Sequence, residues 1–199
     1  MFLDGYAMVA LFDKGVGIID TVGNIVLPCQ YEGVIVISNN LFGIAINEKW
    51  GFTDKKGNII CNCKYDSLSP HFNKDNHEIS SFSVWMNKKA GLIDPTGKEI
   101  IPCIYNRTVN DFSENLTAVA LNDKYGFIDK YGKMVIPFKY DYADSFSEGL
   151  AKAQMKNKWG LIDKMGIEQI PFKYDLISYC SIGLIGVRMD GKVGFIKKV

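Results

Sequence analysis

Apolar and polar residues alternate over short stretches of the chain, which indicates β-strands. The stretch 149–155 (GLAKAQM) alternates small or apolar residues with polar ones, as a half-buried strand does. WGLID at 159–163 and EQIPFKY at 168–174 follow it and predict a second and a third strand. No stretch of about 12 residues keeps a helical apolar period, so we expect no long helix. The pattern predicts an all-β protein built from three-stranded antiparallel units.

The turns between these strands carry residues that suit tight hairpins. We place the first turn at Asn157-Lys158 and, in the last copy of the pattern, at Asp190-Gly191, a dipeptide that favours a type I′ turn. The second turn reads DKMG, where Gly166 is expected to take a positive φ. The Asp163 carboxylate can accept hydrogen bonds from the amides of the same turn.

The three-strand pattern recurs along the whole chain. An anchor glycine in the second strand returns at intervals of 34, 40, 35, 34 and 34 residues. These anchors are Gly17, Gly51, Gly91, Gly126, Gly160 and Gly194. In five copies a second glycine and then a tyrosine follow at constant spacing; the tyrosines are Tyr31, Tyr65, Tyr105, Tyr140 and Tyr174. The sixth copy, DGKVGFIKKV, stops after its anchor strand. We therefore expect residues 1–199 to form a single repeat domain of about six units, the last one incomplete.

The second and third strands indicate how the units pack. Adjacent apolar residues in the second strand, such as Phe127 and Ile128, point to both faces, which is typical of a strand buried between neighbours. The anchor glycine is expected to leave room for a bulky group from the adjacent unit. Four of five third strands carry a central proline, which favours an edge strand or a bulge. These prolines are Pro28, Pro102, Pro137 and Pro171.

Two arrangements of the units are compatible with this repeat. We favour an open, superhelical, solenoid-like stack, because the last copy ends after two strands and the first begins with its own first strand. A closed ring usually shares one unit between its termini, and the N-terminus supplies no third strand for the last copy. A closed six-bladed, propeller-like ring is the alternative.

The amino-acid sequence of the repeat resembles that of a known family. KWGLIDKMG with IPFKYD, and KYGFIDKYGKMVIPFKYD at 124–141, closely resemble the WG-repeat (KWG-repeat) family of bacterial proteins. The resemblance covers essentially the whole chain and implies a repeat scaffold without a common catalytic motif. The chain departs from the family pattern at Val16 and Ala90 in the tryptophan position and at Asn62 in the proline position.

Composition and charge exclude several kinds of partner. The net charge is +1, and only two of the 23 basic residues are arginine, so no nucleic-acid-binding face is expected. The longest apolar stretches fall far short of the roughly 20 residues that cross a bilayer, so membrane insertion is not expected. The start, MFLDGYAMVALF, lacks a basic region and makes a poor signal peptide, which favours a cytoplasmic protein.

The cysteines allow a metal site, although core packing is favoured. Cys61 and Cys63, with His71 and His77 nearby, supply ligands that zinc uses, but the Cys-x-Cys spacing is unusual for zinc. All five cysteines occupy repeat positions where other copies carry apolar residues, and free cysteine behaves as a small hydrophobe. We therefore expect no cofactor and keep the metal-binding or metal-dependent site as an alternative.

Two polar positions recur with the repeat. An aspartate follows each of five anchors by three residues, and capping of the second turn explains it better than a ladder of acidic ligands. These aspartates are Asp20, Asp54, Asp94, Asp129 and Asp163. A lysine two residues before the anchor, such as Lys124, is expected to be a solvated turn residue.

The function predicted from the sequence is a non-enzymatic scaffold that binds an unidentified protein partner. No nucleophile is paired with a base, and both histidines lie in one polar insertion at 69–80, where the repeat interval rises to 40 residues. Insertions in stacked repeats map to loops that often bind partners, although a surface loop that simply tolerates added length at small entropic cost is the favoured explanation. The candidate partner-binding residues are His71, Phe72, His77 and Glu78 in the insertion, and Trp50, Tyr125 and Trp159 before the anchor glycines. For these three aromatic residues, core packing is favoured over an exposed binding stripe.

Overall fold

The computed structural model describes residues 2–38, 40–73, 76–107, 112–179 and 183–197. These residues form β-strands and no helix, which confirms the all-β prediction. The chain divides into two compact units, Met1–Cys103 and Ile104–Val199, and each is described by itself. The single repeat domain over residues 1–199 and the open, superhelical stack of its units remain predictions from the sequence.

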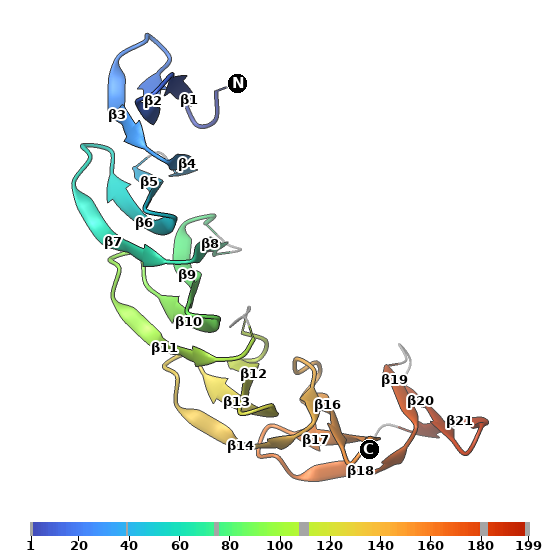
Figure 1. Ribbon diagram of the computed structural model, residues 1–199. Helices are drawn as coiled ribbons and strands as arrows, with labels where there is room; N and C mark the ends of the chain where they lie inside the picture. The colour runs from blue at the N-terminus through green and yellow to red at the C-terminus, as the bar shows by residue number, and fades with distance from the viewer. Residues whose placement is uncertain (1, 39, 74–75, 108–111, 180–182, 198–199) are drawn as a thin grey trace. The chain divides into compact units, whose positions relative to one another are not determined.

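The strands of the first unit form three small sheets (Figure 1). They are β1 (Tyr6–Leu11), β2 (Gly15–Asp20), β3 (Ile25–Tyr31), β4 (Gly33–Ser38), β5 (Leu41–Ile46), β6 (Lys49–Asp54), β7 (Ile59–Tyr65), β8 (Ser67–Phe72), β9 (Ile79–Met86), β10 (Lys89–Ile93) and β11 (Glu99–Tyr105), which ends two residues past the division. The sheet orders are β1-β2-β3, β4-β5-β6-β7 and β8-β9-β10-β11.

The second unit repeats this organisation. Its strands are β12 (Leu116–Leu121), β13 (Lys124–Asp129), β14 (Met134–Tyr140), β15 (Tyr142–Ala143), β16 (Leu150–Met155), β17 (Lys158–Asp163), β18 (Glu168–Tyr174), β19 (Leu176–Tyr179), β20 (Leu184–Met189) and β21 (Lys192–Lys197). The sheet orders are β12-β13-β14, β15-β16-β17-β18 and β19-β20-β21. The three strands predicted in 149–174 are β16, β17 and β18. Four copies add a strand before them, namely β4, β8, β15 or β19, which the sequence analysis missed.

The turn residues differ slightly from the prediction. The first hairpin turn of the fifth copy consists of Lys156 and Asn157, both with positive φ, whereas the sequence analysis placed it one residue later. The turn at Asp190-Gly191 is confirmed. Gly166 has φ +76° in the second turn, as expected.

The proline-bearing third strand is both an edge strand and bulged. In every sheet that contains it, this strand lies at one end of the strand order. In the fourth copy, Tyr125 pairs with Tyr140 and Phe127 with Ile136, so one residue of β13 faces three of β14. Both expectations from proline are confirmed.

The bulge explains the anchor glycine. A Cβ on Gly126 would lie 2.7 Å from the Ile136 carbonyl oxygen and 2.9 Å from Cδ1 of Phe138, both on β14. The expected bulky neighbour from another copy was therefore wrong: the third strand of the same copy fills the space. Phe138 in turn packs against Tyr105 of the preceding copy, with ring centroids 6.0 Å apart.

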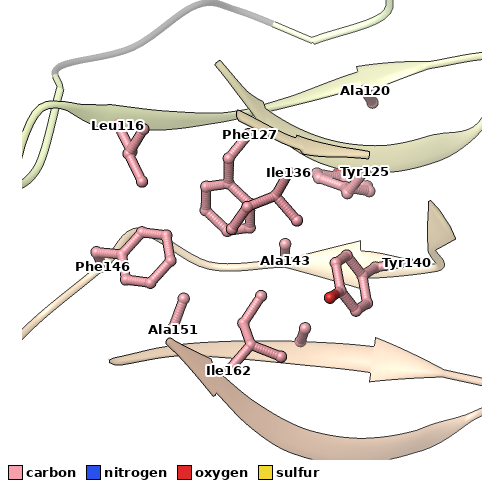
Figure 2. Packing of buried hydrophobic residues seen from close by; sticks show 11 residues of the cluster. Leu116, Ala120, Tyr125, Phe127, Ile136, Tyr140, Ala143, Phe146, Ala151 and Ile162 are labelled. Carbon is pink, nitrogen blue, oxygen red and sulfur yellow. The ribbon is translucent and has the colours of Figure 1, made fainter. Parts of the chain in front are cut away.

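Successive sheets within each unit share a hydrophobic core. Figure 2 shows the core between the sheets of β12–β14 and β15–β18. Phe127 and Ile136 contribute from the first sheet, and Ala151 and Ile162 from the second. Phe127 and Ile128 are both fully buried, which confirms the two-faced second strand. No helix in the described ranges is long and apolar enough to cross a bilayer.

Candidate functional site

A hollow of about 430 Å³ lies beside the β8–β9 hairpin in the first unit. We call it the hairpin hollow. Ile37, Phe72 and Ile79 supply apolar surface, and Asp4 and Glu78 supply carboxylates. The hollow lies at the insertion that lengthens the repeat. The insertion supplies part of its lining, and Ile37 and Asp4 come from parts of the chain that precede the insertion.

Both ends of the insertion are part of a β-hairpin. Residues at both of its ends belong to β8 and β9. The Asn73 amide donates to the Glu78 carbonyl oxygen at 2.7 Å, and the His77 amide donates to the Asn73 carbonyl oxygen at 2.9 Å. The Asn76 side chain also donates to the Glu78 carboxylate at 2.8 Å. These bonds hold His77, which has φ +56°, and Glu78 at the rim of the hollow.

The structure brings three of the four predicted insertion residues together. Phe72, His77 and Glu78 line the hairpin hollow, and Phe72 remains 49% exposed. His71 does not line it, because its Nε2 lies 2.6 Å from Oγ of Ser83, a buried residue of β9. His71 therefore has a structural hydrogen bond within the hairpin.

The three aromatic residues before the anchor glycines pack against neighbouring strands. Trp50 lies against Gly33, whose Cβ would be 3.2 Å from the tryptophan ring. In the second unit, Tyr142 links Tyr125 and Trp159, with ring centroids 5.1 and 5.7 Å apart. Tyr125 is only 8% exposed. These residues do not line the hairpin hollow.

The two cysteines of the Cys-x-Cys motif are thiols bonded to backbone carbonyls. Cys61 donates to the Asn62 oxygen at 3.7 Å, and Cys63 donates to the Ile44 oxygen at 3.6 Å. Burial raises the pKa of both thiols, which disfavours the thiolate that binds metals. In the parts of the chain that the structure describes, no three His, Cys, Asp or Glu side chains are grouped closely enough to hold a metal ion.

The recurring aspartates of the second turn act as caps. Oδ1 of Asp163 accepts hydrogen bonds from the amides of Met165 and Ile167, both at 2.9 Å. Pairs of turn amides donate in the same way to Asp20, Asp54, Asp94 and Asp129. The turn-capping prediction is confirmed in all five copies.

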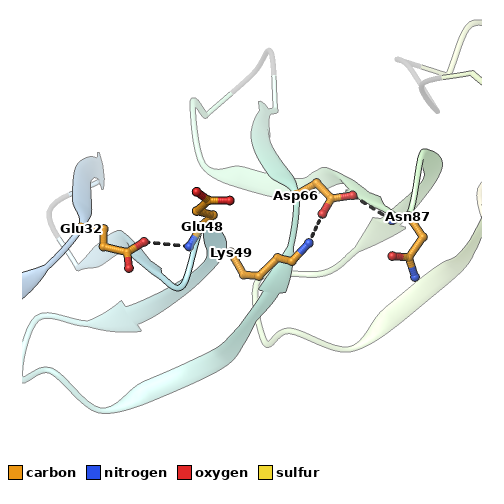
Figure 3. Close-up of polar contacts among 5 residues, drawn as sticks. All are labelled: Glu32, Glu48, Lys49, Asp66 and Asn87. Atoms are coloured by element: carbon orange, nitrogen blue, oxygen red, sulfur yellow. Dashed lines mark hydrogen bonds and ion pairs between the residues drawn. The ribbon is translucent and has the colours of Figure 1, made fainter.

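A second recurring carboxylate, which the sequence analysis missed, joins successive copies. Asp66 forms an ion pair with Lys49 and accepts a 2.8 Å hydrogen bond from the Asn87 amide in the next hairpin turn (Figure 3). Glu32 accepts bonds from two turn amides, including that of Glu48 at 2.7 Å. In both cases the residue after the third strand accepts hydrogen bonds from amides of the next hairpin turn, and we call this arrangement the carboxylate staple.

The carboxylate staple recurs in the second unit. Asp141 pairs with Lys124 at 2.5 Å and accepts a hydrogen bond from the Lys156 amide at 2.6 Å. Asp175 pairs with Lys158 at 2.6 Å and also bonds the next hairpin turn. In these three copies the lysine two residues before the anchor (Lys49, Lys124 or Lys158) is therefore ion-paired, not merely solvated as expected. An acidic residue fifteen positions after four of the anchors was the signal that could have revealed the staple.

Acid is expected to weaken the carboxylate staple. The hydrogen bond from lysine, above all, holds the pKa of Asp66 and Asp141 below the usual 3.8. A pKa that is lower in the folded state adds stability above the unfolded-state value, and this stability is lost as pH falls through the folded-state value. Thermal unfolding between pH 6 and pH 3 should therefore show a smaller loss of midpoint for Asp66→Asn/Asp141→Asn than for the wild type.

The control for this experiment removes two aspartates outside the staple. Asp13 and Asp123 are exposed residues of the chain, and Asp13→Asn/Asp123→Asn leaves every staple carboxylate in place. Its midpoint should follow the wild-type pH dependence. Equal pH dependence of all three proteins would show that the staple adds no acid-sensitive stability.

Comparison with known proteins identifies one sequence family. The model of the WG containing repeat matches residues 17–50, 50–75, 91–125, 125–159 and 159–192. No curated protein matches the sequence. A solved structure described as a crystal structure of the eukaryotic initiation factor is 12% identical, with a TM-score of 0.48, and covers 98% of this chain. The chain spans 60% of that protein.

Proposed function

This chain belongs to the family of WG-containing repeat proteins, and we propose that it is a non-enzymatic scaffold whose hairpin hollow binds a segment of a partner protein. The observation that carries the proposal is the half-exposed Phe72 ring at a hollow formed where the regular repeat is interrupted. Insertions in repeat proteins lie in loops on one face, which is often the binding face. In this proposal the regular copies form the framework, and the insertion forms the surface that binds the partner.

The chemistry of the hollow indicates the kind of segment that fits. Ile37, Phe72 and Ile79 offer apolar contact for one large side chain. Asp4 and Glu78 add negative charge, and no lysine or arginine is among the described lining residues. Complementary charge favours association and discriminates between partners. We therefore infer a segment with an apolar residue flanked by lysine or arginine, and we assign no catalytic role to the hollow.

The test compares partner capture by two matched variants. Phe72→Ser/Glu78→Lys removes the aromatic ring and reverses one charge at the hollow. Tyr131→Ser/Asp123→Lys makes the same kinds of change at exposed positions of the second unit. A lysine already occupies the position equivalent to Asp123 in the third copy, at Lys88, with a similar positive φ. The control variant should therefore keep the wild-type circular dichroism. Phe72 and Glu78 are exposed residues, so Phe72→Ser/Glu78→Lys should keep it as well.

Capture from extracts of the source cell, quantified by mass spectrometry, distinguishes the outcomes. A partner should be recovered by the wild type and the Tyr131→Ser/Asp123→Lys control. Its recovery should fall by about tenfold or more with Phe72→Ser/Glu78→Lys, because aromatic anchors and facing charges carry much of the binding energy. Equal recovery by all three folded proteins, or no partner above background, would overturn the proposal.

A further inference from the structure

A pocket of about 230 Å³ in the second unit is lined by residues of β12, β13 and β15 and of the segments that follow β11 and β15. We call it the arginine pocket. Arg107, which follows β11, contributes a guanidinium, and Asp144, which follows β15, contributes a carboxylate. Thr117 of β12, Tyr125 of β13 and Tyr142 of β15 contribute side chains that carry hydroxyl groups. All of these residues belong to one unit, and none of them lines the hairpin hollow.

Three of these residues depart from the repeat, and the three departures meet at this pocket. Thr117 takes a position that is apolar in the other five copies, at Ala7, Phe42, Phe82, Ala151 and Ile185. Arg107 takes the position of Gly33, Ser67, Tyr142 and Leu176, and Asp144 takes that of Ile35, Ser69, Val109 and Ser178. The other copies that have these two positions therefore carry no charge there. The repeat framework does not require the three polar side chains, which indicates a local role for them.

The Arg107 guanidinium has no acidic partner among the described residues. Its Cζ lies 5.6 Å from the centroid of the Tyr125 ring, and no described carboxylate forms an ion pair with it. Asn106 occupies the position at which the other copies carry the acidic residue of the carboxylate staple. A guanidinium over an aromatic face keeps its N–H groups available to bind a carboxylate through two parallel hydrogen bonds. Arg107 therefore supplies a positive charge that the described part of the chain does not pair.

Asp144, by contrast, already has a cationic partner. Nζ of Lys152 lies 3.0 Å from Oδ2 of Asp144, and the Tyr142 hydroxyl donates to Oδ1 at 3.3 Å. The charges of Lys152 and Asp144 cancel, so the positive charge of Arg107 remains and favours a ligand with one negative charge. A carboxylate can accept about four hydrogen bonds, so Asp144 can also accept one from a ligand.

Two buried residues add hydroxyl groups that can donate hydrogen bonds. Thr117 is 3% exposed and Tyr125 is 8% exposed. The Tyr125 hydroxyl has no hydrogen-bond partner among the described residues, which costs free energy in a buried position. Burial raises the pKa of Tyr125, so the hydroxyl keeps its proton at neutral pH and can donate to an acceptor. A ligand oxygen would supply the acceptor that this hydroxyl lacks.

We propose that the arginine pocket binds a small hydroxycarboxylate, whose carboxylate pairs with Arg107 and whose hydroxyl donates to Asp144. The hydroxyl groups of Thr117 and Tyr125 donate to the oxygens of the same carboxylate. The pocket is smaller than the roughly 300–1,000 Å³ of typical ligand sites, which restricts the ligand to a few carbon atoms, as in lactate. This inference concerns the second unit and does not depend on the hairpin hollow.

Lactate is the probe, and two compounds of nearly the same shape are its controls. Lactamide lacks the negative charge, and propionate lacks the hydroxyl group. Each compound is added to the isotope-labelled chain, and the amide chemical shifts are followed by NMR. Lactate should shift the amides of Thr117, Tyr125 and Tyr142 in a saturable way. Lactamide should bind at least about tenfold more weakly, because it cannot form charge-assisted hydrogen bonds with Arg107. Propionate should bind about fivefold more weakly, because it loses the hydrogen bond to Asp144.

Arg107→Gln and Arg188→Gln distinguish a site at the pocket from general attraction of anions to the chain. Each removes one exposed arginine, and the chain has only these two, so both variants should keep the wild-type thermal midpoint. Arg107→Gln should weaken lactate binding by about tenfold or more, and Arg188→Gln should leave it unchanged. Equal lactate affinity of Arg107→Gln and the wild type would overturn the proposal. Equal binding of lactamide and lactate, or no saturable shift at the pocket with lactate, would also overturn it.

Discussion

Gly126→Ala is expected to destabilise the second unit by about 3 kcal/mol, the upper part of the usual range for overpacking a filled site. The new Cβ would meet the Ile136 carbonyl oxygen at 2.7 Å and the Phe138 amide nitrogen at 3.0 Å. Both atoms belong to the backbone of the bulged strand β14, so no rotamer change can relieve the contact. Urea denaturation followed by fluorescence of Trp159, the tryptophan of this unit, measures the loss.

Gly194→Ala is the matched control, because it changes the same repeat position in the last copy, where a Cβ would meet no described atom within 4 Å. Both substitutions restrict the unfolded chain equally, so the difference between them reports contacts in the folded state. The Gly194→Ala protein should stay within about 0.5 kcal/mol of the wild type, as is usual for surface changes. Equal destabilisation by the two substitutions would contradict the crowding argument.

The strands were predictable because the repeat displays each pattern several times. Proline at the centre of the third strand correctly indicated both an edge and a bulge. The space above the anchor glycine is filled by the backbone of the third strand of the same copy, and this was not predictable. The bulge changes the register of that strand, so its backbone lies where regular alternation along a strand would not place it. The added strands β4, β8, β15 and β19 were missed because their sequences share no common alternation and their lengths differ. β15, for example, has only two residues, Tyr142 and Ala143.

The candidate site was predictable in position but not in composition. The break in the repeat interval located Phe72, His77 and Glu78, which the structure places at one hollow. It could not indicate Ile37, which reaches the hollow through the packing of separate strands. Nor could it exclude His71, whose hydrogen bond to Ser83 depends on the register of β8 and β9. Side chains that meet only through register or packing between strands leave no signal in spacing.

Phe127→Ala is expected to cost about 3–5 kcal/mol, the usual range for emptying a fully buried phenylalanine site. The Phe127 ring is inaccessible to solvent and packs against Phe146, with ring centroids 4.8 Å apart (Figure 2). Its core also includes Ile162 of the next sheet, so the cavity weakens the contact between neighbouring copies. Stability in a repeat array depends on such nearest-neighbour interfaces. The urea midpoint reported by Trp159 should fall, with a broader transition if the two sheets then unfold separately.

Phe195→Ala tests whether burial, and not the repeat position itself, carries this cost. Phe195 occupies the position of Phe127 in the last copy but is 68% exposed. Removing an exposed ring leaves no cavity, so the cost should stay below about 1 kcal/mol. Similar losses for Phe127→Ala and Phe195→Ala would contradict the role of burial. A large loss for Phe127→Ala alone would locate the stabilising contact in the core shared by successive sheets.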